Sequence, residues 1–152
     1  MDKMKDISVN RKAFHDYHIL ERYEAGIVLK GSEIKSIRLG RVNLKDAYAR
    51  PDGNELWLFN AHIAAYQAAI NDTHRPDRPR KLLLHRRQID ELAAQAGQKG
   101  LTLVPLRIYI KNGKAKLEIG VGKGKRQFDK RESIQKRETD REVERAMKTR
   151  TR

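Results

Sequence analysis

Two apolar segments that flank a single Asn-Gly pair constrain the fold of this chain more than any other feature. Residues 101–110 and residues 115–121 are rich in Leu, Val and Ile, and the four residues between them are Lys111-Asn112-Gly113-Lys114. Asn-Gly is the preferred pair for a tight hairpin turn, because both of its residues readily adopt a positive φ. The sequence therefore predicts a long antiparallel hairpin near the end of the folded part of the chain.

Three further segments have the composition of strands. Residues 17–29 mix aromatic and β-branched residues in partial alternation, and residues 46–50 and 55–66 flank a Pro-Asp-Gly-Asn turn at 51–54. Residues 71–79 are a predicted loop, since the prolines at 76 and 79 do not support regular strand pairing.

Two short helices interrupt these strands. In the first, Ser32 is the predicted N-cap and Gly40 ends the helix. The second ends at Gly97, and its apolar residues recur at helical spacing: Ile89, Leu92, Ala93 and Ala96. Many short strands with few helices favour a mainly β protein, namely an antiparallel β-barrel like the oligonucleotide/oligosaccharide-binding (OB) fold.

Charge divides the chain into two parts. It carries 34 Lys and Arg against 20 Asp and Glu, a net charge of +14, and such a field attracts polyanions. We expect residues 1–122 to form the barrel. Residues 123–152 hold twelve basic and six acidic side chains and few apolar ones, so we expect a basic tail that is disordered when free. Thr139 and Glu142 stand in capping-box relation, which predicts a helix when the tail meets a charged surface.

Several function classes lack support in the sequence. No cysteine is present and no apolar run approaches the roughly 18 residues of a membrane span, which fits a cytoplasmic protein. His15, Asp16 and His18 do not have the spacing of a metal site, and the glycine-rich segment at 120–125 completes neither a dinucleotide-binding nor a P-loop pattern. We therefore expect no metal, no cofactor and no enzymatic activity.

The basic residues are the feature of the sequence that indicates a function. They crowd the first helix and the segment after the proline-rich loop, where they could form one stripe along a phosphate backbone. The chain has only one Trp, five Tyr and three Phe, which favours recognition of a folded RNA by its shape over stacking of many bases. The basic residues of this stripe predicted to contact RNA are Lys30, Lys35, Arg80 and Lys81.

Six segments, in this order along the chain, resemble the SmpB family, the small protein B or SsrA-binding proteins. They are NRKAFHDY at 10–17, YEAGIVLKGSEIKS at 23–36, NLKDAY at 43–48, RKLLLH at 80–85, KGLTLVPL at 99–106 and GKRQFDKR at 124–131. The resemblance implies an OB-like barrel that binds the tRNA-like domain of transfer-messenger RNA (tmRNA, or SsrA RNA). It also implies a role in trans-translation, the rescue of stalled ribosomes.

The resemblance also implies partners and roles. The tail would enter the empty mRNA channel and the decoding centre, against small-subunit rRNA. Elongation factor Tu and alanyl-tRNA synthetase would act on the same RNA, and the protein would be a monomer in the RNA complex, away from any membrane. Asn10, His15, Glu24 and Leu83 match family residues tied to the RNA-binding face. The tail residues that match the family motif are Gly124, Lys125, Arg126, Asp129, Lys130 and Arg131.

The roles of two residues and the function of the protein stay open. Glu24 could accept hydrogen bonds from RNA or form an internal ion pair, and Leu83 could contact RNA or serve packing. A general RNA-binding or ribosome-associated OB-fold protein would use the same barrel and tail. A small nuclease with His15 or His85 as acid or base is a third possibility.

Overall fold

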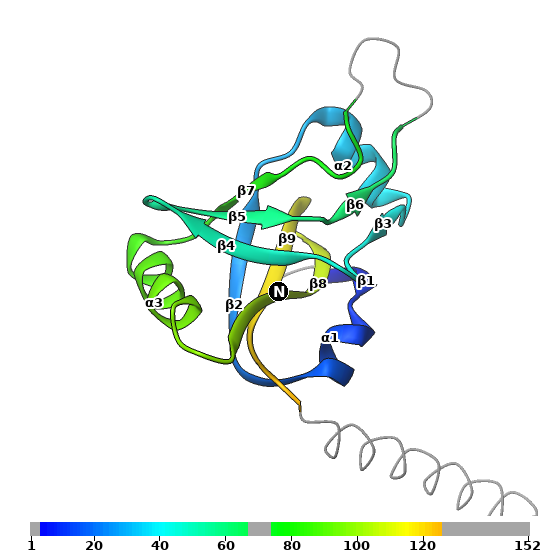
Figure 1. Cartoon of the computed structure of the whole chain (residues 1–152). Helices are drawn as coiled ribbons and strands as arrows, with labels where there is room; N and C mark the ends of the chain where they lie inside the picture. The colour runs from blue at the N-terminus through cyan, green and yellow to red at the C-terminus, as the bar shows by residue number, and fades with distance from the viewer. Residues whose placement is uncertain (1–3, 67–73, 126–152) are drawn as a thin grey trace, which may run out of the picture.

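A computed structural model describes residues 4–66 and 74–125, and it contains nine strands and three helices within these ranges. Six strands pair into a closed ring in the order β8–β4–β5–β7–β2–β9, and β9 pairs back with β8. Every pairing is antiparallel. The prediction of a mainly β, antiparallel barrel is confirmed (Figure 1).

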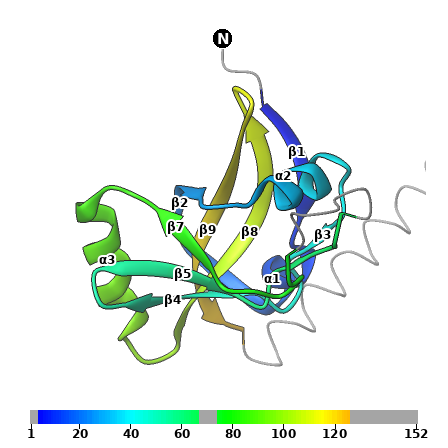
Figure 2. The ribbon, with the colours of Figure 1, turned by 90° about the horizontal axis from the view of Figure 1, so that it is seen from above.

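The ring strands are β2 (Tyr17–Ile27), β4 (Tyr48–Asp52), β5 (Glu55–Phe59), β7 (Arg80–Leu83), β8 (Leu101–Lys111) and β9 (Lys114–Gly124). Strand β1 (Met4–Val9) extends the sheet by pairing with the second half of β8. Strands β3 (Val42–Asn43) and β6 (His62–Ile63) form a separate small ribbon. Three helices flank the ring: α1 (Arg11–Asp16), α2 (Gly31–Arg38) and α3 (Arg86–Ala96). Figures 1 and 2 both place α3 on the side of the barrel away from α1 and α2.

The interior of the barrel is built by alternation along each strand. Ala25, Leu82 and Leu117 are almost fully buried, and their neighbours along the strand point outward, as the pleat of a strand requires. Leu92 of α3 and Ile37 of α2 join the same core cluster. Both helices are therefore held by burial of one apolar side, and their polar faces remain on the surface.

The β8–β9 hairpin has the geometry that its Asn-Gly pair predicts. Asn112 and Gly113 have φ values of 51° and 79°, and Lys111 pairs with Lys114 across the turn. Strand β9 continues to Gly124, two residues beyond the predicted end of the barrel. The predicted tail beyond Lys125, including the helix signal at Thr139, lies outside the described residues.

Local details differ from the sequence predictions at several places. The N-cap of helix α2 is Lys30, not the predicted Ser32, and the Lys30 backbone N–H donates to the Glu33 carboxylate at 2.8 Å. Ser32 is buried beside His74. The strand predicted at 55–66 is divided into β5 and β6 by Asn60, which has a positive φ of 62°. Helix α1 and strands β1, β3 and β7 were not predicted, because all four are short and lack clear apolar periodicity.

Candidate nucleic-acid interface

Strand β7 separates the predicted RNA-contacting residues into two groups, because its side chains alternate between the core and the surface. Leu82 and Arg80 point inward and are buried, whereas Lys81 and Leu83 point outward. Leu83 pairs with Gly26 of β2, and Gly26 pairs in turn with Lys116 of β9. We call the outward surface that contains Lys81, Leu83, Gly26, Lys116 and Glu24 the Leu83 face.

Leu83 is an apolar side chain held at the surface. It is 50% exposed, although it lies next to the barrel core. A Cβ on Gly26 would approach the Leu83 Cβ to 3.3 Å, so a glycine at this position leaves room for Leu83. Beside it is a hollow of about 440 Å³ with apolar walls from β2 and α2 and a basic rim. Its basic rim consists of Arg38, Lys114 and Lys116.

Glu24 carries a negative charge close to these basic residues. Its carboxylate accepts a hydrogen bond from the Tyr109 hydroxyl and lies 3.4 Å from Lys111 Nζ. The Tyr109 hydrogen bond is the main reason that the pKa of Glu24 lies below its usual value. The side chain is exposed as well, so the internal pair holds the carboxylate in place while it still faces solvent.

Lysines on β7 and at α2 supply further positive charge on the surface of the barrel. Lys81 Nζ lies 3.0 Å from Glu55 Oε1, with both side chains partly exposed. Lys30 and Lys35 are exposed at the start and along the surface of α2, and Lys35 Nζ is 5.3 Å from the ring centroid of Tyr66. Such exposed ammonium groups can exchange their present partners for phosphates at little cost.

Arg80 has a different place from its neighbour Lys81. It is fully buried, and its Nε donates to Glu33 Oε2 at 2.5 Å. Its other nitrogens donate to the carbonyls of Ala61 and Pro76, at 2.8 and 2.9 Å. The Arg80 side chain therefore offers no surface to an RNA in this conformation, and it ties β7 to α2 and to the segment before β7.

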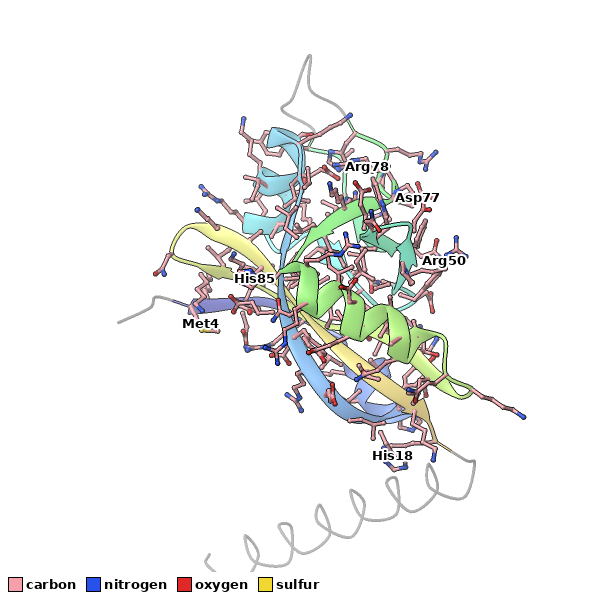
Figure 3. All side chains as sticks on the ribbon, turned by 90° about the vertical axis from the view of Figure 1, so that its left-hand side faces the viewer. Met4, His18, Arg50, Asp77, Arg78 and His85 are labelled. Atoms are coloured by element: carbon pink, nitrogen blue, oxygen red, sulfur yellow. The ribbon has the colours of Figure 1, made fainter. Side chains whose placement is uncertain are left out.

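Glu33 is the centre of this buried network. Burial raises its pKa, but hydrogen bonds from Arg78, the Lys30 amide and Arg80 outweigh burial, so the pKa lies below its usual value. Both Glu33 oxygens also lie 3.1 Å from Arg78 Nε. Figure 3 shows Arg78 beside Asp77 on the segment that leads into β7. The network thus fixes the position from which Lys81 and Leu83 project.

Asn10 and His15 lie at α1, apart from the Leu83 face; Figure 1 places α1 and α2 at opposite ends of the barrel. Asn10 is buried, and its side chain donates to the carbonyls of Leu44 and Pro105 at 3.0 and 2.8 Å. Its Oδ1 also accepts from the Ala13 N–H at 3.2 Å, which caps α1. Half-buried His15 at the other end of α1 has Nδ1 3.0 Å from Asp16 Oδ1.

The residue that follows strand β9, Lys125, is attached to helix α1. The Lys125 N–H donates to the Asp16 carbonyl at 2.9 Å, and Lys125 Nζ donates to the Phe14 carbonyl at 3.3 Å. Gly124, just before it, is exposed. The other predicted tail residues, Arg126, Asp129, Lys130 and Arg131, lie outside the described residues.

Within 4–66 and 74–125, no group of three or more His, Asp or Glu side chains is arranged to hold a metal ion. No helix in the same ranges is long and apolar enough to cross a membrane.

The sequence shows which residues are basic, but not whether each side chain points into the core or toward solvent. The alternation that turns Arg80 inward and Lys81 outward depends on the register of β7, and the partner Glu33 is 47 positions away in the sequence. The N-cap role of Asn10 could have been recognised from an Asn that precedes a short helix-compatible segment. A closed antiparallel barrel with a basic outer surface defines a class, the small β-barrels that bind nucleic acids.

Comparison with known proteins narrows this class to one family. The family model described as SmpB protein matches residues 7–149. An SsrA-binding protein of Carboxydothermus hydrogenoformans is 57% identical over 146 residues, which covers 96% of this chain and 98% of the relative. A second, from Halalkalibacterium halodurans, is 57% identical over 148 residues, 97% of this chain and 96% of the relative. The chain belongs to the SmpB family, as its sequence segments predicted.

A solved structure has the same fold. It is described as "tmRNA-SmpB: a journey to the center of the bacterial ribosome", and it matches with a TM-score of 0.68 and 47% sequence identity. The match covers 84% of this chain and 93% of the solved chain.

Proposed function

We propose that this protein binds the tRNA-like domain of tmRNA and delivers that RNA to stalled ribosomes in trans-translation. The observation that carries the proposal is the Leu83 face, an apolar side chain and hollow ringed by cations on a barrel of the SmpB family. The names of the relatives and the ribosome-bound structural neighbour support the same partners. In this proposal the protein acts in the cytoplasm as a monomer, and it catalyses no reaction.

Residues of the Leu83 face have complementary roles in this proposal. Leu83 packs against a base or ribose, and Lys81 and the α2 lysines Lys30 and Lys35 contact phosphates. Glu24, held by Tyr109, accepts hydrogen bonds from amino or 2′-hydroxyl groups of the RNA. Salt-dependent phosphate contacts supply affinity, and the shape of the apolar hollow and the fixed carboxylate supply selectivity.

The remaining predicted residues act indirectly or at a second place. Arg80 positions β7 through Glu33, and Asn10 positions α1 through its three hydrogen bonds. His15 lies where Lys125 leaves the barrel, and it contacts RNA near the start of the tail. The tail, from Gly124 and Lys125 through Arg126, Asp129, Lys130 and Arg131, enters the empty mRNA channel and decoding centre. Elongation factor Tu and alanyl-tRNA synthetase act on the RNA that the barrel holds.

A pair of exposed leucines tests the RNA-binding face. Leu83→Ala removes apolar contact at the interface, and we expect the affinity for the tRNA-like domain to fall about tenfold. Leu20→Ala is the matched control, because Leu20 is 55% exposed on β2 and lies outside the hollow. Equal affinities of the two variants in a filter-binding or fluorescence-anisotropy titration would contradict the assignment of this face.

Truncation after Lys125 tests the division between barrel and tail. The ring of strands closes within residues 17–124, so we expect the truncated protein to fold and to bind the tRNA-like domain within a few-fold of the full chain. Tagging of peptides on stalled ribosomes should be lost in the same variant. Loss of RNA binding together with tagging would instead place the principal RNA contacts in the tail.

A further inference from the structure

A second surface of the barrel carries aromatic side chains that the core does not use. In β4 and β5, Ala49, Leu56 and Leu58 are buried in the core, so the residues between them point outward. The outward residues include Tyr48, Trp57 and Phe59, which are partly exposed and do not pack against either core cluster. With Arg50, which also points outward, they form a surface that we call the aromatic strip.

The aromatic strip is already organised for stacking. The rings of Tyr48 and Phe59 lie 5.5 Å apart at an interplanar angle of 20°, and the Arg50 guanidinium carbon lies 5.0 Å from the Phe59 centroid. Arg50 is exposed, and Figure 3 shows it projecting away from the barrel. Two aromatic rings and a guanidinium thus form one stacked group on the outer surface of the barrel.

Trp57 lies next to this stacked group. It pairs with Arg50 on one side and with Lys81 on the other. Its indole N–H donates to Glu55 Oε2 at 3.1 Å, and Glu55 also holds Lys81 Nζ at 3.0 Å. The hydrogen bond orients the indole ring at the surface, and the strip carries positive charge at both Arg50 and Lys81.

We propose that the aromatic strip binds unpaired RNA nucleotides by stacking bases on Trp57 and on the Tyr48–Phe59–Arg50 group, while Lys81 contacts a phosphate. Unpaired nucleotides are the occupants because only they expose the faces of their bases, and aromatic rings and guanidinium planes are the groups that bind such faces. The net charge of +14 and the two cations of the strip complement a polyanion. The strip lies on β4 and β5, so it is a different surface from the Leu83 face on β2 and β7, with Lys81 at the border of both.

Trp57 is the only tryptophan in the chain, so tryptophan fluorescence, excited at a wavelength that tyrosine does not absorb, reports on this strip alone. The full-length protein is titrated with an oligouridylate of about twelve nucleotides, which has no base-paired structure. We expect saturable quenching of Trp57, because a stacked base contacts the indole directly. Inorganic polyphosphate of similar charge is the probe without bases, and it should leave the fluorescence nearly unchanged.

Three variants separate stacking on the strip from general attraction. Arg50→Gln should weaken the oligouridylate affinity about three- to tenfold. Arg22→Gln is the matched control, since Arg22 is also an exposed arginine above a phenyl ring, 5.5 Å from Phe14, but on β2. Glu55→Gln removes the carboxylate that competes for Lys81, so it should strengthen binding about two- to threefold.

The proposal is overturned if oligouridylate does not quench Trp57, if polyphosphate quenches it equally, or if Arg50→Gln and Arg22→Gln behave alike. Leu83→Ala should leave this quenching unchanged. The result for oligouridylate is therefore independent of the result for the tRNA-like domain.

Discussion

The neighbouring residues Arg80 and Lys81 give the sharpest test of which basic side chains support the fold and which contact RNA. Arg80→Met keeps a long side chain but removes the partner of buried Glu33 and the donors to the carbonyls of Ala61 and Pro76. Breaking a buried pair by removing one partner costs about 3–5 kcal/mol. Lys81→Gln removes an exposed pair with Glu55, which costs about 0–1 kcal/mol.

Urea unfolding followed by circular dichroism measures these differences. With a slope of about 2 kcal/mol/M, we expect Arg80→Met to lower the midpoint by about 1.5–2.5 M and Lys81→Gln by less than about 0.5 M. RNA affinity should follow the opposite order. Under conditions where each variant is folded, Lys81→Gln weakens binding of the tRNA-like domain, and Arg80→Met stays within a few-fold of the original protein.

A second substitution tests the cause of the stability loss. Adding Glu33→Gln to Arg80→Met removes the uncompensated buried carboxylate, so the double variant should recover part of the lost stability. The reasoning is refuted if Arg80→Met unfolds within about 1 kcal/mol of the original protein and yet loses RNA affinity, because Arg80 would then be a contact residue.

Further predictions concern the barrel itself. Gly113→Ala should cost about 1–2 kcal/mol in urea unfolding, because the residue has a φ of 79°. Gly120→Ala should lower the free energy of unfolding by about 1–3 kcal/mol, since its Cβ would lie 2.8 Å from Leu106 Cδ1; wild-type stability would show that β9 can shift. Asn10→Ala should cost about 1–3 kcal/mol through the buried carbonyls that it leaves without a donor, and an unchanged midpoint would contradict its bracing role. The pKa of Glu33 is lowered in the folded state, so its stabilisation is complete above about pH 4.3 and is lost as pH falls through the lowered value; Glu33→Gln should flatten the dependence of the urea midpoint on pH below 5.

Local signals in the sequence predicted the parts of the fold that depend on a few adjacent residues. The Asn112-Gly113 turn is one such case, because both of its residues have a positive φ and Asn and Gly are the residue types that adopt it most readily. Helix α3 is another, since its core contact Leu92 lies within a regular apolar spacing and Gly97 is its C-cap. The break at Asn60 was not predicted, because the apolar residues on both sides read as one continuous strand.

The functional surface depended on information that the sequence does not display locally. The sequence shows which residues are basic, but the register of the strands decides which of these side chains point toward solvent. In Glu55–Phe59, alternate residues are Leu56 and Leu58 on one face and Trp57 and Phe59 on the other. Because both faces are apolar, periodicity could not distinguish core from surface, and the aromatic strip became visible only once the barrel placed Leu56 and Leu58 inside.

One competition measurement tests the central claim most directly. The full-length protein is bound to labelled tRNA-like domain of tmRNA at about 0.3 M salt, where phosphate contacts alone are strongly weakened, and unlabelled elongator tRNA is added as competitor. We expect the tRNA-like domain to be preferred by a factor of about 10³ or more, as in specific nucleic-acid complexes. Equal competition by the two RNAs, with binding to both lost together as salt rises, would contradict the account and leave a general RNA-binding barrel.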